Sequence, residues 1–146
     1  MKKIFFLFSA AALFFAANAF SFQSFQSKEQ TRELSKQFMT AIVALDVQGA
    51  FKLLQPYFLT TNQEEFAKLQ IQTISQLDAY ADKFGFPIGF ELVKEEKISE
   101  LLVRYTYLEK YEANVLRWTF VFYKPKGEWL FQSLSWDENL QPIFDK

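Results

Sequence analysis

Residues 118–136, WTFVFYKPKGEWLFQSLSW, contain the pattern that decides the fold. Two runs of aromatic and aliphatic residues flank the segment KPKGE at 124–128. Proline suits the second position of a type I turn, and glycine suits the left-handed residue that follows such a turn in a hairpin. The segment therefore predicts two antiparallel strands in which Lys124 lies opposite Glu128 as an opposite-charge pair.

This register assigns the side chains of both strands to two faces, because successive side chains in a strand point to opposite sides of the sheet. The expected core face carries Leu116, Trp118, Phe120 and Phe122 beside Leu130, Gln132, Leu134 and Trp136. The expected outer face carries Arg117, Thr119, Val121 and Tyr123 beside Trp129, Phe131, Ser133 and Ser135.

Two more strands precede this hairpin, so the region after Pro87 predicts a four-stranded antiparallel meander. Its expected strands span about 89–97, 100–111, 114–124 and 128–137. A tight turn at residues 113–114 sets Tyr111 against Leu116. The core face then also carries Leu101, Val103, Tyr105, Tyr107, Glu109, Tyr111, Phe90 and Leu92, while Glu91, Val93 and Glu95 point outward.

The chain before Pro87 has the apolar period of helices. A first helix is expected over residues 28–45, and Asp46 is suited to cap a second, short helix over 47–54. Thr61 and Glu64 have the spacing of a capping box, which predicts a third and longest helix that Gly85 ends. The expected fold class is α+β.

The order of helix, short helix, long helix and four antiparallel strands resembles the nuclear transport factor two-like fold. The resemblance covers about residues 28–137. The two segments that show it are FMTAIVALDVQGAFKLLQPYF at 38–58 and the hairpin at 118–136. It implies a cone in which three N-terminal helices pack on one face of a curved four-stranded sheet. The family includes isomerases, dehydratases, epoxide hydrolases, ligand carriers and non-catalytic dimerising modules, so fold alone leaves the function open.

The first 19 residues, MKKIFFLFSAAALFFAANA, have the three parts of a bacterial signal peptide. Two lysines precede an apolar run at 4–16, and Ala-Asn-Ala at 17–19 forms an A-x-A cleavage site between Ala19 and Phe20. The alternative is an uncleaved membrane anchor, but a spanning helix needs about 20 apolar residues and this run is shorter. We expect a periplasmic or secreted protein that has no membrane contact after cleavage.

Cleavage leaves a lead segment at 20–27 and one domain at 28–146. The net charge falls from −1 to −3 because two lysines leave with the leader, which makes nucleic acid an unfavourable partner. The chain has no cysteine and no histidine. Thiol nucleophiles, histidine-dependent triads and Cys or His metal sites are therefore excluded, and the sequence has no motif for a metal or a cofactor.

The expected core face contains polar groups where a cone would hold a ligand cavity. The candidate pocket residues are Tyr105, Tyr107, Glu109, Trp118 and Gln132. Such a pocket suits a small apolar or aromatic ligand. A buried carboxylate with a raised pKa can also act as a general base, with a tyrosine hydroxyl polarising a carbonyl. The structural alternative is that the tyrosines bury their rings and bond their hydroxyls locally.

The expected outer face contains an apolar patch, which is typical of a surface that binds a partner. The candidate interface residues are Arg117, Val121, Tyr123, Trp129 and Phe131. A second copy of the chain could cover them by two-fold pairing. The alternative is that the lead segment, with Phe20, Phe22 and Phe25, folds over this patch.

The leading hypothesis is thus a non-catalytic exported domain that binds a small apolar or aromatic ligand or forms a homodimer. The first rival is a cofactor-independent isomerase or lyase that uses Glu109 with Tyr107 or Tyr105. The second rival is an accessory subunit that binds a protein through the outer sheet face.

Overall fold

The computed structural model describes residues 23–58 and 63–145. The expected leader, its cleavage site and the Thr61 capping residue lie outside these ranges. Within them, no helix is long and apolar enough to cross a membrane.

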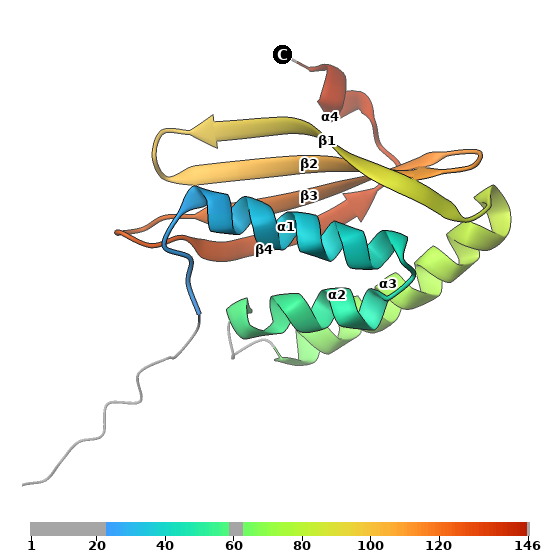
Figure 1. Cartoon of the computed structure of the whole chain (residues 1–146), viewed down its shortest axis with the longest axis horizontal. Coiled ribbons are helices and arrows are strands. Elements are labelled where there is room, and N and C mark those ends of the chain that lie inside the picture. Colours follow the sequence, from blue (N-terminus) through green and yellow to red (C-terminus); the bar gives the residue numbers. More distant parts are fainter. Residues whose placement is uncertain (1–22, 59–62, 146) are drawn as a thin grey trace, which may run out of the picture.

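Three helices precede a four-stranded antiparallel sheet (Figure 1). The elements are α1 (Lys28–Val43), α2 (Val47–Leu54), the 3-10 turn η1 (Gln55–Tyr57), α3 (Gln63–Phe84), β1 (Pro87–Ile98), β2 (Leu102–Tyr111), β3 (Val115–Tyr123), β4 (Leu130–Asp137) and α4 (Gln141–Phe144). The strands lie in the order β1-β2-β3-β4. The predicted α+β class and the meander are confirmed, and each strand end falls within two residues of its expected position.

Local caps explain where the first two helices begin. The hydroxyl of Ser27 accepts a hydrogen bond from the Gln30 amide at the start of α1. Asp46 Oδ1 accepts one from the Gly49 amide at 2.8 Å, which confirms its predicted capping role. At the end of α3, Gly85 has a φ of 86°, a left-handed conformation that favours glycine and ends the helix as predicted.

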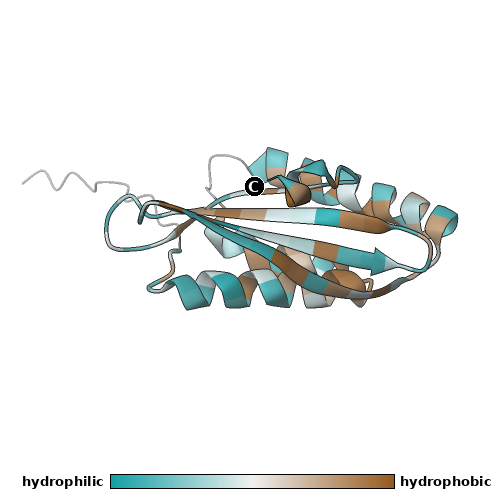
Figure 2. Cartoon of the chain, turned by 90° about the horizontal axis from the view of Figure 1, so that it is seen from above, coloured by the Kyte–Doolittle hydropathy of each residue, from teal (hydrophilic) through white to brown (hydrophobic). Residues whose placement is uncertain are grey.

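The helices α1 and α3 pack on the same face of the sheet, and α2 packs against both of them through Phe51. From α1, the Phe38 ring lies 5.4 Å from Phe120 on β3. From α3, Thr73 Oγ1 accepts a hydrogen bond from Trp136 Nε1 on β4, and the Tyr80 hydroxyl donates to the Val115 carbonyl on β3. Hydrophobic and hydrophilic residues alternate along these elements, as expected where only one side of each is buried (Figure 2).

The register between β2 and β3 differs from the prediction by two residues. Glu109, not Tyr111, pairs with Leu116, because the connection spans residues 112–114 instead of a two-residue turn. A shift of two keeps every side chain on its face. The predicted core-face residues Val103, Tyr105, Tyr107, Glu109 and Tyr111 are all buried, but the expectation for Leu101 is wrong, since it is 49% exposed beside the β1–β2 turn.

A β-bulge changes the face assignment in β4. Tyr123 pairs with Leu130, so the predicted Lys124–Glu128 pair is not formed, and Glu128 accepts hydrogen bonds from Ser24 and Gln26 instead. The register shifts between the pairs Val121–Ser133 and Phe122–Phe131, which leaves Gln132 without a partner.

This bulge has two consequences for the predicted sites. Gln132 is exposed, so its placement on the core face is wrong. Phe131 and Trp129 are 7% and 4% exposed, so their placement on the outer surface is also wrong. Leu134 and Trp136, beyond the bulge, pack against the core as predicted.

A second bulge in β1 turns Glu95 toward the helices. The register shifts between Leu92 and Lys94, and Glu95 then pairs with Tyr105 on the core face. The prediction that Glu95 points outward is therefore wrong, and its carboxylate forms an ion pair with Lys28 of α1. Phe90 and Leu92, before the bulge, pack against the core as predicted.

The lead segment pairs with Trp129, the residue that precedes β4. Phe25 and Trp129 exchange two backbone hydrogen bonds of 2.8 Å, and the Phe25 ring stacks on Tyr57 at 4.2 Å. The alternative in which the lead segment folds over an outer patch is therefore wrong for Phe25, because its ring lies in the core beside Tyr57 and Phe122. Phe20 and Phe22 lie outside the described residues.

Candidate functional site

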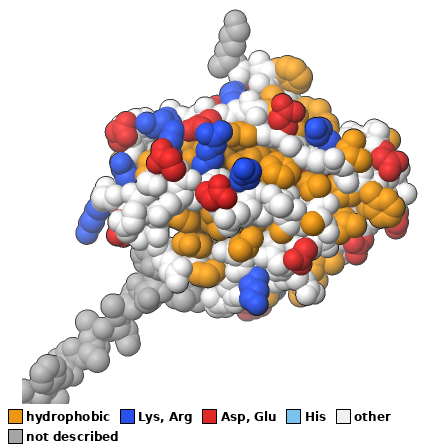
Figure 3. Space-filling view, in the orientation of Figure 1, with side chains coloured by type: hydrophobic (Ala, Val, Ile, Leu, Met, Phe, Trp, Pro, Cys, Tyr) orange, Lys and Arg blue, Asp and Glu red, His pale blue; other side chains and the backbone are white. Residues whose placement is uncertain are grey.

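A groove of about 560 Å³ lies between α1 and β1. Its walls and floor are formed by Glu29, Arg32, Glu33, Lys36, Phe90, Glu91, Leu92 and Tyr107. Figure 3 shows charged side chains of both signs gathered over this side of the molecule, with hydrophobic side chains between them.

The helical wall of the groove carries four charged residues, Glu29, Arg32, Glu33 and Lys36. Their spacing of three and four places them on one face of α1. None of them forms an ion pair within the described ranges, and Glu33 accepts a hydrogen bond from the exposed amide of Gln37. This wall therefore offers charges of both signs to a ligand.

The floor of the groove is apolar. Phe90 and Leu92 project from the same face of β1, and Leu92 pairs with Tyr107 of β2. The rings of Phe90 and Tyr107 meet edge to face at 5.9 Å. Three adjacent side chains thus form a surface on which a ring or an alkyl chain can lie.

Tyr107 brings a polar group to this floor. Burial raises the pKa of its hydroxyl to about 12, and the positive charge of Arg32 acts in the opposite direction. The hydroxyl stays protonated at neutral pH and remains a hydrogen-bond donor. Arg32 and Tyr107 therefore place two donors at the same part of the groove.

Glu109 and Trp118, two of the predicted pocket residues, do meet. Trp118 Nε1 donates to Glu109 Oε2 at 2.8 Å, while Oε1 has no hydrogen-bond partner among the residues that the structure describes. Burial raises the pKa of Glu109, and the Trp118 hydrogen bond and the nearby Tyr111 hydroxyl oppose that rise. Tyr111 nevertheless forms no hydrogen bond with Oε1, which is the orphaned atom. Neither Glu109 nor Trp118 has exposed surface.

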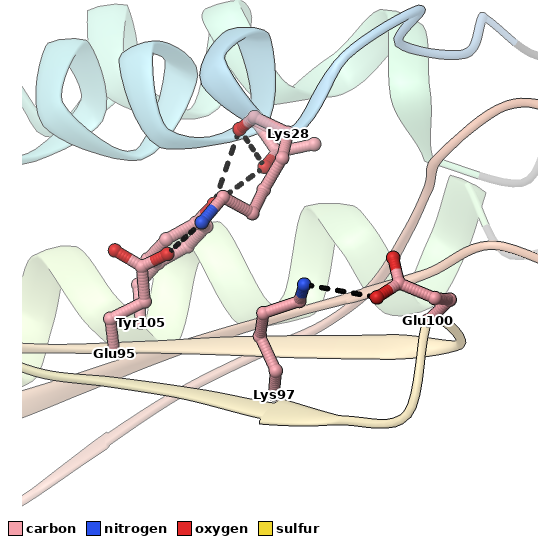
Figure 4. A network of polar contacts seen from close by, with 6 residues as sticks. Lys28, Glu95, Lys97, Glu100 and Tyr105 are labelled. Atoms are coloured by element: carbon pink, nitrogen blue, oxygen red, sulfur yellow. Dashed lines mark hydrogen bonds and ion pairs between the residues drawn. The ribbon is translucent and has the colours of Figure 1, made fainter.

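Tyr105 has a structural role at the start of α1 (Figure 4). Its ring is fully buried, and its hydroxyl shares a 2.9 Å hydrogen bond with Thr31 Oγ1 and donates to the Lys28 carbonyl at 3.2 Å. Lys28 also reaches Glu95 on β1. These contacts attach the first turn of α1 to the first two strands and so fix one wall of the groove.

The five predicted pocket residues therefore do not form one open pocket. Tyr107 lines the groove, Glu109 and Trp118 are sealed in the core, and Tyr105 bonds to α1. Gln132 lies away from all of them because of the bulge in β4. No group of acidic residues in the described ranges could hold a metal ion.

The five predicted interface residues are also divided. Arg117 makes two hydrogen bonds to the Asp137 carboxylate, at 3.1 and 2.7 Å, and Tyr123 is 36% exposed. Trp129 and Phe131 belong to the core. Val121 lines a different groove, of about 450 Å³, on the outer side of the sheet. The other residues that line this outer groove are Glu96, Lys97, Ile98, Leu102, Val103 and Arg104.

Sequence reasoning placed Phe90, Leu92 and Tyr107 on one face but did not identify the groove. The signal it missed is the charged face of α1, where Arg32 and Lys36 recur one turn apart. That face becomes part of a site only because α1 lies along the first strand of the sheet, and this position depends on tertiary packing.

Comparison of the chain with protein-family models, with curated proteins and with solved structures found no match.

Proposed function

We propose that this chain is an exported, non-catalytic binding module of nuclear transport factor two-like fold, and that its ligand is a small amphipathic molecule with an apolar or aromatic part. The observation that carries this proposal is the groove between α1 and β1, where the floor of Phe90, Leu92 and Tyr107 lies beside unpaired charges. Its volume of about 560 Å³ is in the range of small-molecule sites.

The burial of Glu109 supports binding over catalysis. A general base must reach the proton that it removes, directly or through one water molecule. Glu109 is 0% exposed and lies under Trp118, so a ligand in the groove does not meet its carboxylate. The isomerase or lyase alternative would require the core to open at this point.

A titration with anilinonaphthalene sulfonate, an anionic aromatic probe, tests the binding proposal. The protein beginning at Phe20 should enhance the probe's fluorescence in a saturable way. Leu92→Gln, which adds an amide to the apolar floor, should weaken binding about tenfold, because burying an unpaired polar group costs about 1–3 kcal/mol. Ile71→Gln is the matched control, because Ile71 is 67% exposed on α3 and lies outside the groove.

Equal affinities for Leu92→Gln and the unsubstituted protein would reject the groove as the binding site. Circular dichroism of both variants must first show that they are folded, because the same probe also binds partly unfolded proteins.

Export is part of the proposal and has its own test. The leader at 1–19 predicts that protein recovered from a bacterial periplasmic extract begins at Phe20. Intact mass spectrometry measures this directly. Recovery of the full-length chain in the membrane fraction would favour the anchor instead.

A homodimer through the outer sheet face is the second candidate function. The observation that favours it is the 450 Å³ outer groove, whose apolar members include Ile98 at 66% exposure. If this face pairs with a second copy, Ile98→Asp should convert a dimer to a monomer in sedimentation velocity. A monomer at all concentrations before substitution would exclude this candidate.

A further inference from the structure

The groove between α1 and β1 reaches the backbone of an edge strand. Phe90, Glu91 and Leu92 all line it, although neighbouring side chains in a strand point to opposite faces of the sheet. Three consecutive residues can border one groove only where that groove extends to the edge of the strand. A ligand there can therefore contact main-chain groups as well as the apolar floor.

Among residues 23–58 and 63–145, no strand lies beside that edge. The sheet order places β1 at one side, and β2 is its only strand partner in the described parts of the chain. Half of the amides and carbonyls of an edge strand point away from the sheet, which makes such an edge a template for another strand.

The two halves of β1 differ in how this edge is protected. Residues 94–97, KEEK, are all charged, and Lys94 Nζ donates to the backbone carbonyls of Pro142 and Asp145, which hold the C-terminal segment nearby. The half before this bulge, residues 88–92, has one charge, and Ile88 lies at a further register irregularity between Pro87 and Gly89 and is 65% exposed. Proteins usually protect edge strands with charges, bulges or covering segments. Residues 89–92, between the two irregularities, are the least protected part of this edge, and they border the groove.

The distance along α1 between Arg32 and Lys36 matches the distance between successive same-face side chains of a strand added beside β1. Side chains on one face of a strand recur about every 6.7 Å, and one helical turn of four residues rises about 6 Å. Two inward side chains of a strand beside β1 would therefore meet successive turns of α1, at Arg32 and at Lys36. Both basic groups lack ion-pair partners among the described residues, so acidic side chains complement them where they face Arg32 and Lys36. Glu29, Glu33 and Glu91 line the same groove and repel acidic side chains at other positions.

We propose that the groove binds an extended peptide, which adds to β1 at residues 88–92 as a fifth strand. One apolar side chain of the peptide lies on Phe90, Leu92 and Tyr107, and acidic side chains at the next two positions on the same face of the strand, two residues apart, point to Arg32 and Lys36. This inference rests on the proposed function and names the class of ligand. A second copy is disfavoured at the other half of the edge, because antiparallel β1 strands centred on residues 94–97 would place Lys94 opposite Lys97 and Glu95 opposite Glu96.

The test uses a fluorescein-labelled peptide, Thr-Phe-Thr-Glu-Thr-Glu-Thr, and fluorescence anisotropy. Its two glutamates and its phenylalanine lie on one face of a strand, and its threonines favour the extended conformation. Two further peptides carry N-methyl groups on either the odd or the even amides. Because alternate amides of a strand face the same neighbour, one methylated peptide should lose at least about tenfold in affinity while the other stays within about twofold.

Charge variants test the role of α1. Arg32→Glu should weaken the peptide about fivefold or more, since it places like charges together. Lys52→Glu is the matched control, because Lys52 is exposed on α2 and lies outside the groove. Replacing both peptide glutamates by lysine should abolish the difference between Arg32→Glu and the unsubstituted protein or reverse it.

Equal affinities of the two methylated peptides would overturn strand addition. If anilinonaphthalene sulfonate binds in a Leu92-dependent manner and the peptide does not, this inference fails while the proposed function stands. If neither probe binds, both fail. A dimer in sedimentation velocity that Glu91→Lys dissociates would show that a second copy occupies the edge, and would also overturn the peptide proposal.

Discussion

Glu109 is an acid sealed inside an aromatic core. Within the described part of the chain, its carboxyl accepts one hydrogen bond, from Trp118, and its other oxygen has no partner. Burial disfavours the charged form of an acid, and the raised pKa of Glu109 follows from it. Ionisation of this side chain therefore lowers the free energy of unfolding, which makes the stability of the fold depend on pH.

Glu109→Gln should reduce this dependence. A glutamate whose pKa is raised on folding keeps a proton that the unfolded chain releases, so stability falls as pH rises from the ordinary glutamate pKa toward the raised value, and stays lower above it. Glutamine removes the titration and keeps an oxygen for Trp118. At about pH 8 the variant should be more stable than the unsubstituted protein by about 1–3 kcal/mol, the usual cost of an unsatisfied buried group.

Urea unfolding at about pH 4 and about pH 8 measures this change. Glu65→Gln is the control, because Glu65 is exposed in the first turn of α3. A stability difference between Glu109→Gln and the unsubstituted protein that is the same at both pH values would show that the carboxyl does not titrate abnormally.

Residue patterns predicted the core side chains of the first three strands well. The alternation of Val103, Tyr105, Tyr107, Glu109 and Tyr111 fixed their face even though the register was two residues out. The same patterns did not show how an individual polar group is paired. Tyr105 forms a hydrogen bond with Thr31, and one oxygen of Glu109 has no partner in the described residues. Both facts depend on how the helices pack against the sheet, which the residue pattern does not show.

At the scale of elements, the β-bulge in β4 decides which side chains belong to the core. Trp129, Leu130 and Phe131 are three consecutive apolar residues, so alternation cannot say which of them points inward. The bulge at Gln132 resolves this by turning Phe131 inward while Leu134 and Trp136 keep the opposite parity. A bulge adds one residue without a distinctive sequence, and the sequence analysis therefore missed it.

Two alanine substitutions in β4 test the bulge. Phe131→Ala should lower the free energy of unfolding by about 3 kcal/mol, as expected for a buried phenylalanine. Gln132→Ala should change it by less than about 0.5 kcal/mol, because Gln132 is exposed. Chemical denaturation gives both values. The opposite order would support the register that the turn at 124–128 predicted.

The lead segment is an element of the core. Phe25 is 4% exposed, stacks on Tyr57 and meets Phe122 edge to face. Phe25→Ala should therefore cost about 3 kcal/mol or more in unfolding free energy. Phe86→Ala is the control, because Phe86 is 64% exposed and its loss should be nearly neutral. Equal effects would mean that the lead segment does not pack as described.

At the scale of the whole molecule, the helices leave one edge of the sheet uncovered beside a charged helix face. The sequence predicted the strand order, and this order already makes β1 an edge strand. It did not predict that α1 lies along this edge, because that position depends on long-range contacts such as Lys28 with Glu95 and Tyr105 with Thr31. The groove is a product of this arrangement.

Ligand binding at the groove should stabilise the whole fold. A molecule that binds only the folded state at a concentration of 100 times its dissociation constant adds about 2.7 kcal/mol. Anilinonaphthalene sulfonate should therefore raise the melting temperature of the unsubstituted protein and of Ile71→Gln, measured by calorimetry. A similar rise for Leu92→Gln at the same probe concentration would place the stabilising site elsewhere.

The most direct test of the groove is chemical-shift mapping of the isotope-labelled protein from Phe20 during a titration with the anionic probe. Our account predicts the largest shifts at the amides of residues 29–36, 90–92 and 107, which line the groove. Shifts concentrated at residues 96–104 and 121, around the outer groove, would contradict it.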